Sequence, residues 1–140
     1  MIKIAKELSD PEQLLIAAAS EEFHEGIVGI VAGRLAENHY KPSLIMGINT
    51  QKGIATWSLR GPDYFNIVEM LKSADDLLER YGGHAAAGGI TVSLDKLEAT
   101  LERFQSYCEA YITPEMMIKS ISVDTPLYDH ELQAQTVEDI

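Results

Sequence analysis

Short apolar runs typical of buried strands alternate along this chain with longer stretches whose apolar residues recur at helical spacing. The strand-like runs are residues 14–20, 42–48, 53–59, 89–93 and 116–124. The helix-like stretches are residues 25–39, 64–81 (in one piece or two) and 94–111. This order predicts an α/β fold in which a mixed β-sheet of about five strands is flanked by helices. The polar residues 49–52 predict a hairpin turn between two of the strands.

The charge of the chain bears on its partners, because phosphate binding requires lysine and arginine. The net charge of −11 therefore argues against a nucleic-acid-binding protein at first sight. The acidity is uneven, however: residues 24–93 carry seven acids and six bases, whereas residues 94–140 carry ten acids and three bases. The first of these two segments is nearly neutral, so it remains a candidate for binding anions.

Cysteine usage and hydropathy indicate the compartment. The single cysteine, Cys108, excludes an internal disulfide and a cysteine-based zinc cluster, which predicts a cytoplasmic protein. It lies on the apolar stripe of residues 94–111, so we expect a core residue and not a reactive thiol. No apolar run reaches membrane-spanning length, and the N-terminus lacks the apolar region of a signal peptide, so we expect no membrane partner.

The organisation of the chain predicts one domain over residues 1–113 and a C-terminal extension over residues 114–140. A helix-like pattern begins near residue 130 and stops at the end of the sequence without a cap. We therefore expect the extension to be the start of a following, truncated unit.

The stretch ERYGGHAAAGGITVS, residues 79–93, surrounds His84 with glycine and alanine. One interpretation is a helix that ends at Gly82 or Gly83, with the histidine in solvent. The other is a bare backbone surface that lets an anion approach closely, with the imidazole as a donor. The stretch is not a P-loop, because no Gly-Lys-Ser/Thr follows it. It is not a dinucleotide fingerprint either, because it follows a predicted helix and leads into a strand.

Three further residues are candidates for ligand binding: His24, Arg60 and Trp57. In FHEGIVG, residues 23–29, Val28 occupies the position where a zinc protease needs its second histidine, so metal binding is not expected there. His24 is then either an exposed or capping residue or an anion contact at a helix N-terminus. Arg60 follows an apolar strand and either binds a phosphate or pairs with Asp63. Trp57 is a core residue or a base-stacking one.

No cluster of carboxylates and histidines has the spacing of a metal site, and no Ser-His-Asp order is present in the sequence. We therefore expect the chain to lack a self-contained hydrolytic site and a metal site.

Three segments in order resemble the RecJ family of single-stranded-DNA-specific exonucleases, and more narrowly its C-terminal, DHH-associated domain. They are FHEGIVGIVAGRLAENHYKP, TWSLRGPDYFNIVEML and RYGGHAAAGG. The resemblance covers roughly residues 13–112. It departs from the family at Phe23, where tryptophan is usual, and in SLRG, where the family has a glycine-rich SGRS form.

The resemblance implies a protein in two halves. A DHH domain, absent from this chain, holds two Mn or Mg ions, while the DHH-associated domain holds the phosphate of single-stranded nucleic acid or a nucleotide. It implies these substrate-binding residues: Gly82, Gly83 and His84 as a clamp, Arg60 and Ser58 as phosphate contacts, and His24 in support of the same cleft. We expect this chain to be inactive alone. The alternatives are a DHH-family phosphoesterase domain for short oligonucleotides or small phosphorylated ligands, and a non-catalytic interaction module.

Overall fold

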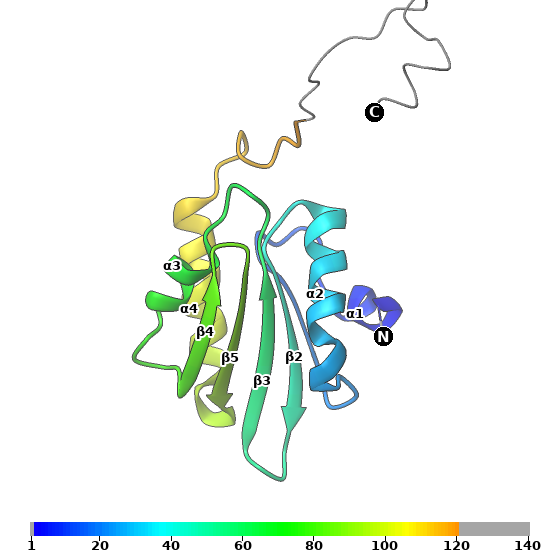
Figure 1. The fold of residues 1–140 in the computed structure, drawn as a ribbon, viewed down its shortest axis with the longest axis vertical. Coiled ribbons are helices and arrows are strands. Elements are labelled where there is room, and N and C mark those ends of the chain that lie inside the picture. Colours follow the sequence, from blue (N-terminus) through cyan, green and yellow to red (C-terminus); the bar gives the residue numbers. More distant parts are fainter. Residues whose placement is uncertain (1, 121–140) are drawn as a thin grey trace, which may run out of the picture.

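The structure is a computed structural model that describes residues 2–120. Its helices are α1 (Ile2–Leu8), α2 (Glu25–His39), α3 (Ile67–Lys72) and α4 (Leu97–Tyr111), the last preceded by the 3₁₀ turn Leu94–Lys96. Its strands are β1 (Ile16–Ser20), β2 (Ser43–Asn49), β3 (Ile54–Arg60), β4 (Arg80–His84) and β5 (Ala87–Ser93). They form one sheet in the order β1-β2-β3-β5-β4 (Figure 1), parallel between β1 and β2 and antiparallel elsewhere. The predicted α/β fold is confirmed.

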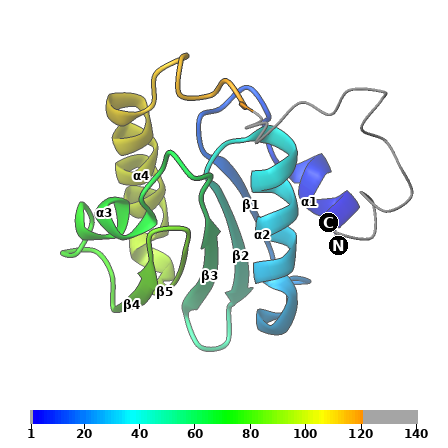
Figure 2. The ribbon, with the colours of Figure 1, turned by 45° about the horizontal axis from the view of Figure 1, so that its top comes forward.

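Helices cover the two faces of the sheet unequally. On one face α2 lies over β2 and β3, and α1 packs beside it, while α3 and α4 pack on the other face (Figure 1, Figure 2). The α3 and α4 side holds the larger core, where Trp57 meets Phe104 edge to face at 6.0 Å between ring centroids. Trp57 is therefore a core residue. On the α2 side, the strip formed by β5 and β4 is left without a helix, and every residue of β4 is exposed.

The helix predicted over residues 64–81 is wrong in its length. Asn66 begins α3, since its side chain accepts hydrogen bonds from the amides of Val68 and Glu69. The helix ends at Lys72, where Arg103 of α4 donates to the carbonyl of Ser73. Buried residues continue into the following turns, as at Ala74, and this spacing imitates a longer helix.

The interpretation of the glycine-rich stretch as the end of a helix is also wrong. The stretch is the strand β4 and its two-residue connection to β5, and β5 begins at Ala87, before the predicted residue 89. The strand predicted over residues 116–124 is wrong for residues 116–120, which are turn and coil. Residues 121–140, including the predicted helical pattern and most of the extension, lie outside the described residues.

The four glycines of the β4–β5 hairpin form two pairs that lie on opposite faces of the sheet. Gly83 and Gly88 are opposite one another on the α3 side. A Cβ atom on Gly83, whose φ is 157°, would collide with the Ala87 carbonyl oxygen, and one on Gly88 would lie 2.8 Å from Cγ2 of Ile67. Gly82 and Gly89 pair on the other face, where a Cβ would meet open space or ordinary contact. Close packing therefore explains only one of the two pairs.

Helix length and hydropathy show whether a described helix could span a membrane. Among the helices of residues 2–120, none is both long and apolar enough to span a bilayer.

The two adjacent glycines allow a matched stability test. We expect Gly83→Ala to lower the free energy of unfolding by roughly 1–3 kcal/mol, because backbone atoms must move to admit the methyl group. Gly82→Ala should leave it unchanged or raise it by up to about 1 kcal/mol, since alanine restricts the unfolded chain. Urea titrations of the two variants provide the measurement, and equal destabilisation would contradict the assignment of the faces.

The buried thiol gives a second test. Burial raises the pKa of Cys108 to about 12 from an ordinary 9.0. The native chain at pH 8 should therefore resist a thiol reagent that reacts at once after denaturation. Because the unfolded thiol ionises first, this group lowers the free energy of unfolding as pH rises from about 9 towards 12. Rapid labelling of the native protein at pH 8 would contradict this placement.

Candidate functional site

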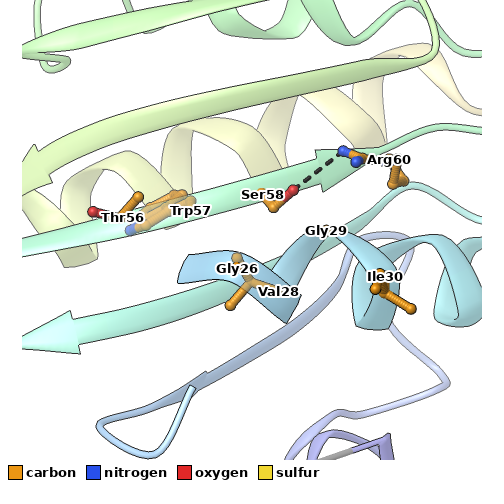
Figure 3. Close-up of a pocket in the computed structure, with 8 residues that line it drawn as sticks. All are labelled: Gly26, Val28, Gly29, Ile30, Thr56, Trp57, Ser58 and Arg60. Carbon is orange, nitrogen blue, oxygen red and sulfur yellow. Dashed lines mark hydrogen bonds between the residues drawn. The ribbon is translucent and has the colours of Figure 1, made fainter. Parts of the chain in front are cut away.

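The outward side chains of β3 begin the site. Trp57 and Leu59 point into the core, so the alternation of the strand turns Ser58 and Arg60 towards the α2 side. Nη1 of Arg60 donates to Ser58 Oγ at 3.1 Å and to the Leu59 carbonyl at 2.7 Å. The guanidinium is thus held back along its own strand, as Figure 3 shows for its contact with Ser58.

A glycine of α2 makes room for this guanidinium. A Cβ atom on Gly29 would lie 2.8 Å from Nη2 of Arg60 and 3.2 Å from Ser58 Oγ. The corresponding position on Gly33 has no neighbour within 4 Å, so close approach explains the first helix glycine but not the second. Gly29 is a residue whose link to Arg60 the sequence did not reveal.

These side chains border an open hollow of about 430 Å³ (Figure 3). It lies between α2 and β3, and Ile30, 63% exposed, stands on its rim. The residues that line it are Gly26, Val28, Gly29, Ile30, Thr56, Trp57, Ser58 and Arg60.

Strand register extends the site across the open strip. Arg60 pairs with Ala87, which pairs with His84, so these three form one row on one face of the sheet. Two strand spacings separate the backbones of Arg60 and His84, about 10 Å. The next row on the same face is Ser58, Gly89 and Gly82. The floor beside the first row therefore carries no side chain larger than serine.

The histidine sits at the end of β4 and is exposed. Its Nδ1 accepts a hydrogen bond of 3.4 Å from the amide of Ala86, so the neutral ring carries its proton on Nε2. The loop that follows is fixed by two backbone bonds: the Gly61 amide donates to the Ala86 carbonyl at 3.0 Å, and the Ile67 amide donates to the Ala85 carbonyl at 2.8 Å. These bonds tie the histidine end of the hairpin to the segment after Arg60.

The alternative in which Arg60 pairs with Asp63 can be checked against the structure. Asp63 accepts from the Tyr40 hydroxyl at 2.5 Å, and no ion pair with Arg60 is found within residues 2–120, so that alternative is wrong. The carboxylate raises the pKa of Tyr40 by accepting this bond.

His24 lies apart from the other candidates. It precedes α2 with an extended backbone, its side chain is exposed, and it makes no capping hydrogen bond. It is not among the residues that line the hollow. The structure thus places Arg60 and His84 in one row and Ser58 and Gly82 in the next, but it does not add His24 to either.

The positions of the histidine, cysteine and carboxylate side chains bear on metal binding. Within the part of the chain that the structure describes, no three side chains of histidine, cysteine, aspartate or glutamate gather as a metal site. The described residues therefore do not fit a resident metal ion, and no metal-assisted step is assigned to them.

Comparison with known proteins identifies relatives of this fold and sequence. The family model of the DHHA1 domain matches residues 12–110. The single-stranded-DNA-specific exonuclease RecJ of Bacillus subtilis is 34% identical over 113 residues, which is 81% of this chain and 14% of that protein. The RecJ of Thermus thermophilus is 37% identical over 105 residues, 74% of this chain and 14% of that protein.

A solved structure agrees with the sequence matches. The crystal structure of an exonuclease RecJ bound to manganese superimposes with a TM-score of 0.68 at 32% identity. The match covers 83% of this chain and 28% of that one. The chain thus spans a small fraction of the length of the relatives it matches.

The link between Gly29 and Arg60 can be tested with a neighbouring glycine as the control. Gly26→Ala meets open space, so it should raise stability by up to about 1 kcal/mol through helix propensity. Gly29→Ala should gain less and should shift the Nε–Hε resonance of Arg60, because the methyl group displaces the guanidinium. The same Arg60 resonance in both variants would contradict the contact.

Proposed function

Because the chain belongs to the DHHA1 domain family, we propose that it is the substrate-binding part of a RecJ-like, metal-dependent 5′-to-3′ exonuclease acting on single-stranded DNA in the cytoplasm. One observation carries the proposal: Arg60 and His84 share a row on the α2 side of the sheet, with Arg60 beside α2 and His84 on the strip that no helix covers, next to the bare backbone of Gly82 and Gly89. A phosphate group there can accept hydrogen bonds from both side chains.

The chemistry of the row suits a terminal phosphate. A guanidinium stays charged at all ordinary pH values and donates in a planar fork that matches two phosphate oxygens. Ser58 and the Leu59 carbonyl occupy only Nη1, so the donors on Nη2 and Nε remain for a ligand. The Ser58 hydroxyl accepts from Arg60 and has its own proton to donate. The exposed imidazole of His84 supplies a donor from the opposite side.

The glycines have separate roles in this proposal. Gly82 and Gly89 leave the backbone bare so that the phosphate and its sugar approach closely. Gly83 keeps β4 against β5 and acts on the substrate only by placing its neighbours. His24, which lies just before α2 and outside the hollow, is proposed to support the cleft only indirectly.

Hydrolysis itself is assigned to another part of the protein. In the proposal a DHH domain supplies the Mn or Mg ions and closes the cleft over the open strip. Residues 1–113 are then the substrate-binding domain, and residues 114–140 lead towards a following unit. The chain contributes by orienting the phosphate and by electrostatic stabilisation.

Titration with thymidine 5′-monophosphate tests the site in the 140-residue chain. Amide chemical shifts should change at residues 58–61 and 82–89. Arg60→Ala should weaken binding about tenfold and His84→Ala about threefold, as expected for the loss of a charged or a neutral donor. Arg34→Ala is the control, since Arg34 pairs with Glu37 on the surface of α2 and does not line the hollow beside Arg60.

Activity measurements complete this test. The chain alone should release no nucleotides from single-stranded DNA, with or without Mn²⁺. Metal-dependent release by the chain, or unchanged binding after both site substitutions, would refute the proposal. The second outcome would favour a non-catalytic interaction module.

A further inference from the structure

Arg80, which the proposed function leaves without a role, lies at the far end of the same open strip. We infer that the strip is a track for at least three linked nucleotides, in which Arg80 binds the phosphate two steps from the one at Arg60 and His84. The inference rests on the proposed function and names its substrate class as a single strand longer than a dinucleotide.

The strip is continuous between its two ends. A second hollow of about 320 Å³ lies over β3, β5 and β4 and shares Thr56 and Trp57 with the hollow beside Arg60. Its lining residues are Thr56, Trp57, Arg80, Tyr81, Gly82, Gly89, Ile90 and Thr91. A ligand at Arg60 can therefore extend along the strands to Arg80 without crossing a helix.

Register fixes the face on which Arg80 lies. Arg80 pairs with Thr91, and Thr91 pairs with Thr56, two residues before Ser58 on β3. The row that contains Arg80 is thus on the same side of the sheet as the row of Arg60 and His84. Between them lies only the row of Ser58, Gly89 and Gly82.

Spacing along the strand sets the number of nucleotides. Arg80 and His84 are four residues apart in β4, so their rows are about 14 Å apart at ~3.4 Å per residue. Successive phosphorus atoms of a nucleic acid strand are joined by six bonds, which extend to about half of that distance. A phosphate at each end therefore requires a third phosphate between them.

The width of the strip suits a single strand. The helix α2 borders the strip along β3, and β4 is the edge of the sheet on the other side. The floor between β3 and β4 spans about 10 Å, less than the ~12 Å of the major groove alone in duplex DNA. A single strand fits on this floor lengthwise.

Arg80 is available for such a contact. Its side chain is exposed, and it forms no ion pair with any residue of the described segment 2–120. Charged residues on edge strands also prevent pairing with other molecules. That role predicts an effect on self-association and none on ligand length, so the two roles are separable.

Oligothymidylates with a 5′-phosphate and one, two, three or six nucleotides test the inference in the 140-residue chain. Affinity should rise between the dinucleotide and the trinucleotide. Arg80→Ala should abolish this rise, weaken hexamer binding about fivefold and leave the mononucleotide unaffected. It should also lower the slope of log K against log salt for the hexamer by about 0.7, the value for one phosphate contact on a single strand.

Controls separate this inference from the proposed function. Arg80→Lys should retain most of the salt slope, and Arg34→Ala should leave length dependence unchanged. An unchanged hexamer affinity and salt slope in Arg80→Ala, with mononucleotide binding intact, would overturn the track alone. Equal weakening of all four ligands would also overturn it. Absence of mononucleotide binding in the wild type would overturn the proposed function together with the track.

Discussion

The packing of α3 against the β4–β5 hairpin is the constraint on which the site depends. It requires Gly88, where a Cβ atom would meet Ile67 and Leu71 of α3, while the close approach of β5 requires Gly83, where a Cβ atom would meet the Ala87 carbonyl oxygen. The same hairpin carries Gly82 and Gly89 on the uncovered face, where no neighbour demands them. Glycine costs conformational entropy in a strand, so the second pair calls for an explanation outside the packing of this chain.

The two faces of β3 also have separate roles. Its inward residues Trp57 and Leu59 build the core, and its outward residues Ser58 and Arg60 face α2. The helix approaches closely enough at Gly29 to contact the guanidinium, which lies in a fixed position before any ligand arrives. Burial on one side of the sheet thus supports polar chemistry on the other. This is the ordinary property of a strand with a period of two.

The sequence predicted the fold where apolar periodicity and structure coincide. Helix α2 was found at its observed bounds, and β2 and β3 within one residue. The strand β4 was missed because RYGGH has no β-branched residue, and its conformation comes from pairing with β5. The end of α3 was missed because buried residues such as Ala74 continue the apolar spacing beyond Lys72.

The site, like the fold, was predicted where local sequence motifs mark it and missed where it depends on contacts between distant segments. The motifs drew attention to Ser58, Arg60, Gly82 and His84, which the fold places in neighbouring rows. The space that Gly29 leaves for Arg60, and the position of Arg80 at the end of the strip, depend on packing and register. No local pattern encodes such relations between distant segments.

The two backbone hydrogen bonds at Ala85 and Ala86 have a consequence for selectivity. They hold the hairpin tip to the segment after β3, so the backbones that carry Arg60 and His84 are fixed relative to one another. Such preorganisation reduces the entropy lost on association. Under the proposed function, an anion that contacts only one of the two side chains gains less from this arrangement than one that contacts both.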